Sequence, residues 1–430
     1  MNTASFLRRL LGGKNEAVDR RTQLLLSLCG QLLAERGEYA STALARDALI
    51  AWHGLDERCR DEFFDALART YSPSPEAVAR AAATYQADPS PENLALLQDA
   101  AEPPRQELFR RLNMAQGGTA ALVSMRGLLL KKLRANPVWR TIDADLMHLL
   151  RSWFNRGFLR LERVDWHTSA MVLEKLIQYE AVHAVEGWRD LRRRLEADRR
   201  CFAFFHPQLP DEPIIFIEVA LTRGMSANVQ PLLEMSSSVA DPQGADCAMF
   251  YSITNCQEGL RGISFGNLLI KQVAEDLKRE FPHLRRFATL SPIPGFRRWL
   301  EGRRVNGAEG PLLERLGDPA WHLAEVPEAL QKLLLRLCAH YLVSVKQGAE
   351  PLDPVARFHL GNGAALERLN WMGDTSEQGM ARSAGLMVNY TYWLAEVERN
   401  HERYFREHLI ITSPQVEKLA RECPLPFLPE

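Results

Sequence analysis

The chain has 430 residues, of which 46% are hydrophobic and 25% are charged, a balance typical of a folded protein with more than one domain and a sizeable core. The formal net charge of −1 gives the protein no overall positive field, which disfavours nucleic acid and anionic membrane surfaces as partners. Since no apolar run reaches about 18 residues, we expect no membrane-spanning helix.

The N-terminal part of the chain is predicted to be helical. Apolar residues recur at helical spacing, and the pattern continues from 140 to 199 after proline-containing interruptions. Ser74 and Ser90, each followed by Pro and Glu, are typical helix N-caps. The helical segments before the first interruption are 15–36, 41–53, 58–71, 74–86 and 91–101. We therefore expect an all-α helical domain over residues 1–190.

The residue pattern changes near position 200, where runs of strand length become rich in apolar and β-branched residues. These predicted strands are 201–206, 213–222, 246–255 and 285–291. An amphipathic helix is predicted at 267–281, because Leu269, Val273 and Leu277 share one face. This alternation indicates an α/β or α+β class of fold.

The C-terminal part repeats this mixture of helices and strands. A helical insertion at 310–349 is followed by a strand-like segment at 356–360, "ARFHL", and by a helix at 391–409. We therefore expect a second domain over residues 191–430, built on a mixed β-sheet.

A glycine-containing loop, "NCQEGLRGISFGNLLIKQV", joins the third predicted strand to the amphipathic helix. Gly259, Gly262 and Gly266 let backbone N–H groups turn toward an anion, and the helix N-terminus favours negative charge. Arg261 and Lys271 would add positive charge. The spacing matches neither G-x-G-x-x-G nor the P-loop, which disfavours dinucleotide and nucleoside triphosphate folds. A phosphate-binding loop and a plain connection both fit this pattern.

Ser291 follows the last predicted strand in the stretch "TLSPIPGFRRWL". Pro292 and Pro294 fix the backbone around it, which suits a catalytic hydroxyl and equally suits a strand terminator. A hydrolase triad is disfavoured, because no G-x-S-x-G elbow exists and Pro292 lacks the backbone N–H of an oxyanion hole.

His359 lies between apolar residues and precedes the turn "GNGA". Histidine is the side chain best suited to proton transfer near neutral pH, although a histidine in an apolar setting is often a core residue. Tyr390 and Tyr392 are interpreted mainly as core residues.

Several longer phrases identify a family resemblance. The loop pattern R-G-x-x-x-G-N resembles the pyrophosphate loop of the GNAT acyl-CoA-binding fold. The phrases "SPIPGFRRWL", "FHLGNGAALERLNWMGD", "GLMVNYTYWL" and "ALTRGMSANVQPLL" resemble the malonyl-CoA decarboxylase family over about residues 200–395. The resemblance implies that the second domain is a GNAT-like catalytic domain.

The resemblance also implies an activity and a site. The enzyme would convert malonyl-CoA to acetyl-CoA and CO₂ without metal or organic cofactor, with Ser291 and His359 as the catalytic pair. Asn362, or backbone N–H groups of the "GNGA" turn, would face an enolate oxygen. Residues that would bind coenzyme A are Arg261, Gly262, Ile263, Ser264, Phe265, Gly266 and Asn267. Ser264 stands where some relatives carry an acidic residue, which leaves the detailed contacts of the loop undefined.

Partners and location follow from the same patterns. The apolar content of the N-terminal helices predicts self-association into a dimer or tetramer. Seven scattered cysteines without a C-x-x-C pair favour reduced thiols in a cytoplasmic protein, and eleven histidines without an H-x-x-x-H pair disfavour a metal site. Two alternative functions are a GNAT-type acyltransferase, which would need an amine acceptor, and a non-catalytic acyl-CoA sensor.

Overall fold

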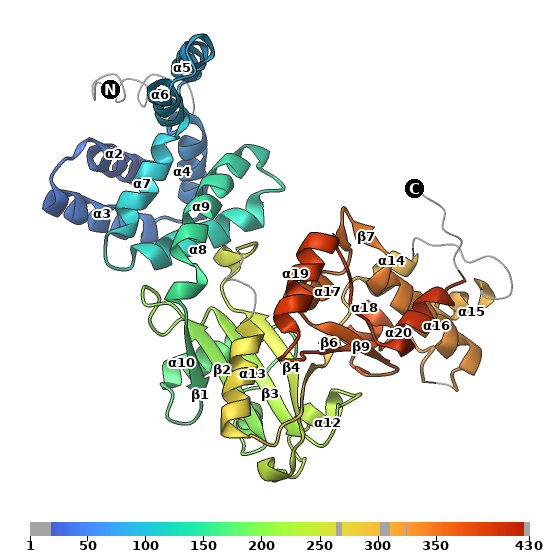
Figure 1. Cartoon of the computed structure of the whole chain (residues 1–430). Coiled ribbons are helices and arrows are strands. Elements are labelled where there is room, and N and C mark those ends of the chain that lie inside the picture. Colours follow the sequence, from blue (N-terminus) through green and yellow to red (C-terminus); the bar gives the residue numbers. More distant parts are fainter. Residues whose placement is uncertain (1–18, 264–268, 302–309, 324, 425–430) are drawn as a thin grey trace. The chain divides into compact units, whose positions relative to one another are not determined.

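The computed structural model describes residues 19–263, 269–301, 310–323 and 325–424. Its contacts divide the chain into two compact units (Figure 1). The helical unit comprises Met1–Leu159, Phe205–Glu212 and Gln257–Phe265, and the sheet unit comprises Arg160–Phe204, Pro213–Cys256 and Gly266–Glu430. The expected boundary after residue 190 stays a prediction.

The helical unit is built from helices, and α2, α4, α5 and α6 begin at a side-chain N-cap. Ser74 accepts a hydrogen bond from the backbone N–H of Ala77, and Ser90 accepts one from Asn93, which confirms both predicted N-caps. The helices are α2 (Arg20–Ala34), α3 (Glu38–His53), α4 (Glu57–Thr70), α5 (Pro75–Ala87), α6 (Pro91–Ala101), α7 (Pro104–Asn113), α8 (Gly118–Lys132) and α9 (Arg140–Trp153).

The core of the helical unit combines aromatic packing with one buried ion pair. The ring of Trp52 contacts those of Phe63 and Phe64, with centroids 5.6 and 5.7 Å away. The Arg105 guanidinium on α7 pairs with the Asp145 carboxylate on α9, and both residues are buried. This ion pair joins two helices through residues that lie 40 positions apart in the chain.

The expectation of continuous helices from 140 to 199 is wrong at one place. Residues Arg160–Val164 form strand β1, an edge strand that pairs with β2 (Arg199–Phe205). The helix-forming residues of "RLERV" adopt the extended state because the open edge of β2 supplies hydrogen-bond partners, a tertiary effect that local pattern does not report. Helices α10 (Ala170–Tyr179) and α11 (Trp188–Arg194) follow.

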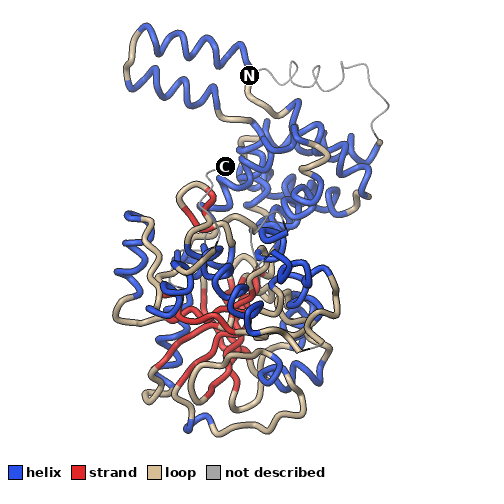
Figure 2. The backbone as a smooth tube through the Cα atoms, turned by 90° about the vertical axis from the view of Figure 1, so that its right-hand side faces the viewer, coloured by secondary structure: helices blue, strands red, loops and turns tan. Residues whose placement is uncertain are grey.

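The sheet unit contains an eight-stranded mixed sheet in the order β1-β2-β3-β4-β5-β10-β6, with β9 also paired to β10 (Figure 2). The pairing of β4 with β5 is parallel, whereas β2, β3 and β4 pair antiparallel, as do the pairs that β10 makes. The remaining strands are β3 (Ile215–Thr222), β4 (Cys247–Asn255), β5 (Arg286–Thr289), β6 (Ser291–Pro292), β9 (Ala365–Asn370) and β10 (Met387–Thr391).

Strands β4 and β5 diverge after a short parallel segment. Their register runs from Cys247 opposite Arg286 to Phe250 opposite Thr289, and the Leu290 N–H then donates to the Phe250 carbonyl. Beyond this point β4 continues along β3 alone, while the chain after β5 moves to β10 as β6. The two strands therefore open a gap at this end of the sheet.

Helices complete the sheet unit. Helix α13 (Leu269–Glu280) connects β4 to β5, and its buried side includes the predicted Leu269, Val273 and Leu277. The later helices are α14 (Phe296–Glu301), α15 (Gly310–Glu314), α16 (Glu328–Val343), α17 (Pro354–Gly361), α18 (Glu377–Ser383), α19 (Val397–Glu407) and α20 (Pro414–Arg421), and a hairpin of β7 (Lys346–Gln347) and β8 (Glu350–Pro351) precedes α17.

The strand predicted at 356–360 is wrong, because this segment belongs to helix α17. Asp353 accepts hydrogen bonds from the N–H groups of Val355 and Ala356, and Pro354 occupies the first turn, so "DP" begins a helix. The predicted helix at 391–409 begins only at Val397, since Thr391 still belongs to β10.

The expected architecture is confirmed: an N-terminal helical region precedes a unit built on a mixed sheet, while the likeness of that unit to the GNAT fold stays a prediction. None of the described helices combines the length and apolar character needed to traverse a bilayer.

The buried ion pair gives a stability prediction. Arg105→Ala should lower the free energy of unfolding by about 3–5 kcal/mol, because the Asp145 carboxylate would remain buried without its partner. The double variant Arg105→Met/Asp145→Leu should cost less, since it removes both charges. Chemical denaturation measures both, with Arg46→Ala, at an exposed ion pair, as the control. Equal losses in Arg105→Ala and Arg46→Ala would contradict the prediction.

Candidate active site

Ser291 and His359 meet in the sheet unit, although 68 positions separate them in sequence. Ser291 lies on β6 and His359 in the last turn of α17, and both are buried, with 4% and 3% exposure. The Ser291 Oγ atom lies 2.9 Å from His359 Nε2, which is hydrogen-bonding distance. The structure thus brings together the two residues that the family resemblance indicates as a catalytic pair.

The hydrogen-bonded chain extends beyond this pair on both sides. Ser291 Oγ lies 2.8 Å from Thr289 Oγ1, and His359 Nδ1 lies 2.8 Å from the hydroxyl of Tyr392. When Ser291 donates to Thr289, its Oγ can accept from His359 Nε2–H, and Nδ1 then accepts from Tyr392. Each side chain of this hydrogen-bonded chain therefore has a partner that fixes its orientation.

The surroundings of His359 favour the neutral imidazole. The ring stacks on Tyr390 with centroids 4.6 Å apart, and burial lowers the pKa of His359 from 6.5 to about 3. Burial also raises the pKa of Tyr390 and Tyr392 well above 10, so both phenols stay protonated. The site is a chain of neutral polar groups in an apolar setting.

Thr289 is held from the side opposite Ser291. Its Oγ1 accepts from the backbone N–H of Tyr390 at 3.2 Å, and its carbonyl accepts from Asn389 Nδ2 at 2.7 Å. The Asn389 side-chain oxygen accepts in turn from Arg368 and Asn370. Residues of β5, β9 and β10 thus hold Thr289, the first side chain of the hydrogen-bonded chain, in position.

A cavity of about 230 Å³ opens at Ser291 and His359, in the gap between the diverging strands β4 and β5. Most of its lining is apolar, and it comes from β4, from the segment around β6, from α17 and from the loop after α10. The lining residues are Val182, Phe250, Tyr251, Ser252, Ile253, Asn255, Leu290, Ser291, Pro292, Pro354, Val355, Phe358 and His359. A small acyl group that enters this cavity meets Ser291 and His359.

Asn362 lies in the predicted turn "GNGA", but this turn follows a helix and not the predicted strand. It is the C-cap of α17, its Nδ2 donates to the Phe358 carbonyl at 2.7 Å, and it is 5% exposed. This contact ends the helix that carries His359. A role toward an enolate oxygen stays a prediction.

The described part of the glycine loop belongs to the helical unit. Arg126 on α8 donates from Nη1 to the carbonyls of Gly259 and Arg261, at 2.7 and 2.9 Å. Only glycine fits at 259, because a Cβ there would lie 1.8 Å from the Val123 carbonyl oxygen, and Gly262 has a φ of +79°. The loop backbone is thus held from beneath by a buried arginine.

The structure describes the side chains of only some of the other predicted loop residues. The Arg261 side chain is exposed and pairs with Glu258 at 2.8 Å, and Ile263 is buried. Lys271 pairs with Glu398 at 2.6 Å. Ser264, Phe265, Gly266 and Asn267 lie outside the described residues.

Local sequence pattern does not indicate most members of the hydrogen-bonded chain. Thr289 belongs to a predicted strand, and the pattern assigns it no functional role. Tyr390 and Tyr392 are predicted mainly to be core residues. Tyr390 lies in β10 and Tyr392 directly follows its last residue, and in extended chain a spacing of two places both side chains on one face, which is the available signal. Within the described residues, no group of His, Cys, Asp and Glu is arranged to hold a metal ion.

Comparison with known proteins gives one consistent result. Residues 157–425 match the family model described as the malonyl-CoA decarboxylase C-terminal domain, and residues 71–154 match the N-terminal domain. Mitochondrial malonyl-CoA decarboxylase of Rattus norvegicus is 40% identical over 347 residues, which cover 73% of this chain and 70% of the rat protein.

Solved structures agree with this match. The crystal structure of malonyl-CoA decarboxylase from Rhodopseudomonas palustris superposes with a TM-score of 0.89 at 48% identity and covers 92% of this chain and 99% of that chain. The enzyme from Agrobacterium vitis gives a TM-score of 0.86 at 46% identity, with the same coverage.

The low pKa of His359 predicts a specific pH dependence of stability. The unfolded chain gains a proton on this imidazole as the pH falls below about 6.5, whereas the folded protein does not until about pH 3. The wild type should therefore lose stability between pH 6.5 and pH 3, by up to about 1.4 kcal/mol per pH unit from this group.

Denaturation at pH 7 and pH 5 measures the effect against His359→Gln, which should show a flatter pH dependence. Nitrogen-15 NMR of the ring should still report a neutral imidazole at pH 5. An imidazolium signal that titrates near pH 6.5 would contradict this assignment.

Proposed function

The chain belongs to the malonyl-CoA decarboxylase family, and we propose that Ser291 and His359 carry out the decarboxylation of malonyl-CoA in the cavity between β4 and β5. The chain is an enzyme of the carboxy-lyase class. The observation that supports the roles of the two residues is their 2.9 Å hydrogen bond in the wall of that cavity.

The chemistry of malonyl-CoA explains why two such residues suffice. The thioester carbonyl accepts the electron pair of the breaking C–C bond, so CO₂ leaves and an enolate remains. A proton must then reach the former C2 carbon to give acetyl-CoA, and the balance is malonyl-CoA plus one proton to acetyl-CoA plus CO₂. The protein has to orient the carboxylate, stabilise the enolate and deliver the proton.

We assign His359 as the proton donor, because its protonation state depends on whether the substrate is bound. Without substrate the imidazole is neutral, because burial lowers its pKa. A malonyl carboxylate in the same cavity is an opposite charge at close range, which raises that pKa, so a proton binds together with the substrate. Departure of CO₂ leaves the negative charge on the enolate, and transfer of the imidazolium proton to the enolate carbon then neutralises both groups in the apolar site.

Ser291 and Tyr392 complete this scheme. We assign the Ser291 hydroxyl to hydrogen-bond the malonyl carboxylate, which places the substrate beside His359 Nε2. Tyr392 bonds Nδ1 and holds the ring in position through the change of charge. The apolar lining of the cavity favours the neutral product CO₂ over the charged carboxylate. The proposed reaction uses neither a metal nor an organic cofactor.

We also propose that the protein is cytoplasmic and self-associates through its helical unit. That unit exposes large apolar side chains, including Tyr39 at 91%, Ile50 at 64% and Met114 at 56%. Exposed apolar surface of this kind supports a protein partner, and a second copy of the chain gives a closed dimer or tetramer.

Two alanine variants test the catalytic assignment. Ser291→Ala and His359→Ala should each lower turnover by about 10² or more, because each removes a group that acts on the reacting atoms. Release of CO₂ and acetyl-CoA from malonyl-CoA, with a chelator and without an acyl acceptor, measures turnover. Coenzyme A binding by calorimetry should be unchanged, and His167→Ala, at an exposed histidine of the sheet unit, is the control.

Full activity in either variant would refute the role assigned to that residue. Product formation that requires an amine acceptor would instead favour an acyltransferase.

Self-association is tested by molar mass in solution. Light scattering after size-exclusion chromatography should give two or four times the chain mass of 48.8 kDa. The double variant Tyr39→Asp/Ile50→Asp should lower this mass, because it places charges on the exposed apolar surface. A monomer at micromolar concentration in the wild type would contradict the proposal.

A further inference from the structure

One wall of the cavity comes from a loop rather than from the sheet. Val182 lines the cavity together with Ser291 and His359, and it lies in the segment between α10 and α11. Its side chain is half-buried. Loops are usually more mobile than the elements they connect, so a wall formed by a loop has a fixed shape only if other groups hold it.

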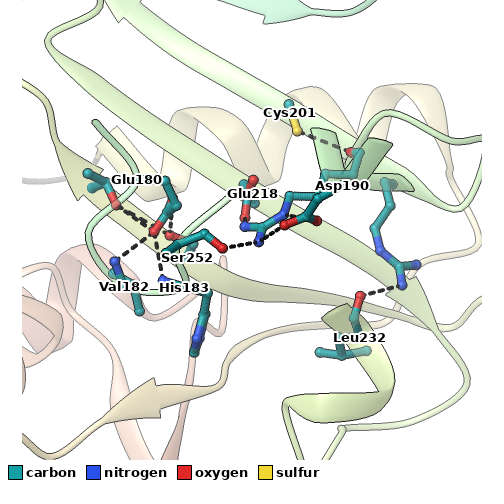
Figure 3. A network of polar contacts seen from close by, with 12 residues as sticks. Glu180, Val182, His183, Asp190, Cys201, Glu218, Leu232 and Ser252 are labelled. Carbon is teal, nitrogen blue, oxygen red and sulfur yellow. Dashed lines mark hydrogen bonds and ion pairs between the residues drawn. The ribbon is translucent and has the colours of Figure 1, made fainter. Parts of the chain in front are cut away.

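A single carboxylate holds this loop against the sheet (Figure 3). Glu180 Oε1 accepts hydrogen bonds from the backbone N–H groups of Val182 and His183, at 2.7 and 3.0 Å. The same carboxylate accepts from Ser252 Oγ at 2.7 Å and from Thr254 Oγ1 at 3.1 Å, both on β4. Glu180 therefore joins the backbone at Val182 directly to β4, the strand that supplies much of the cavity lining.

A second buried group holds the next residue of the loop. Arg194 Nη2 donates to the Ala184 carbonyl at 3.2 Å, while its other donors bond Asp190 and Glu218. Arg194 is 2% exposed and Glu218 is fully buried. Glu218 is paired with Ser252 across β3 and β4, so both anchors of the loop rest on the same part of the sheet.

Glu180 is a buried carboxylate whose four hydrogen bonds all go to the loop and to β4, and it lies outside the cavity lining. The wall at Val182 is also stiff, because a β-branched side chain on a fixed backbone has few rotamers available. Any substituent at C2 of a malonyl group would have to fit in the 230 Å³ cavity beside Ser291, His359 and this wall.

We propose that Val182 determines which substituents at C2 the enzyme accepts, and that Glu180 is the positioning residue that keeps Val182 in the wall. This inference rests on the proposed function, because it concerns the acyl group of a malonyl thioester. It assigns the selection of the substrate to the loop after α10, separate from the chemistry at Ser291 and His359.

The test compares malonyl-CoA with methylmalonyl-CoA, which carries one methyl group at C2. In Val182→Ala the ratio of kcat/KM for methylmalonyl-CoA to that for malonyl-CoA should rise about tenfold or more, since an apolar pocket discriminates one methyl group by about 10–200-fold. In Val182→Ile the ratio should fall. A ratio that changes less than twofold in both variants overturns the proposal.

Assays of the wild type distinguish a failure of this inference from a failure of the proposed function. If the wild type releases no CO₂ from malonyl-CoA, the proposed function is wrong. If it does so and the ratio does not respond to Val182, only the present inference is wrong.

The role of Glu180 is tested by its own series of variants. Glu180→Ala should raise the same ratio, whereas Glu180→Gln should keep it within about twofold of the wild type, because the amide oxygen can still accept from Val182 and His183. Glu174→Ala, at an exposed position of the same helix, is the matched control. Thermal unfolding checks that each variant is folded.

A double variant distinguishes positioning from a general loss of structure. In Glu180→Ala, the further change Val182→Ala should alter the ratio less than twofold, because the wall is already displaced. Two outcomes would show that Glu180 is merely structural. The first is that the two changes alter the ratio independently of each other. The second is that Glu180→Ala loses activity equally toward both substrates.

Discussion

The parallel pairing of β4 with β5 ends at Phe250 and Thr289, and the geometry of the cavity depends on that end. Beyond it, the backbone of β4 remains paired with β3, while Ser291 continues on β6 beside β10. The hydroxyl therefore lies where the sheet has opened and not within its continuous hydrogen bonding. A helix enters the same gap with His359 in its last turn, so strand divergence and helix placement together define the position of the cavity at Ser291 and His359.

Burial has two consequences for the polar groups in this gap. It makes charge on His359 costly without a counter-ion, and it makes a hydroxyl without a partner inside the protein costly, as at Tyr251 and Tyr390. The row of Thr289, Ser291, His359 and Tyr392 avoids the second cost because each side chain is the partner of the next. In the proposed mechanism, the charge of the imidazole responds to an incoming carboxylate, which would link binding of the substrate to uptake of the proton that the reaction consumes.

Local pattern predicted most helices and the central strands, because caps such as Ser74 and Ser90 and the apolar periodicity are properties of short segments. It failed at β1, where pairing with β2 decides the conformation, and at "ARFHL", where the cap Asp353 lies outside the segment considered. The proximity of Ser291 to His359 is a long-range property. Only the family resemblance indicated that these two residues act together, and no pattern indicated Thr289 as the next group in the row.

The loop at 257–263 is shaped by residues from far earlier in the chain. Arg126 bonds two of its carbonyls, Asp143 pairs with Arg126, and Val123 lies against Gly259 so closely that no side chain fits there. A shortened protein that begins after residue 190 would keep Ser291 and His359 yet lack all three supports, and it would also lose β1 from the edge of the sheet. Such a protein would keep the sequence of the loop without the helical residues that shape its backbone.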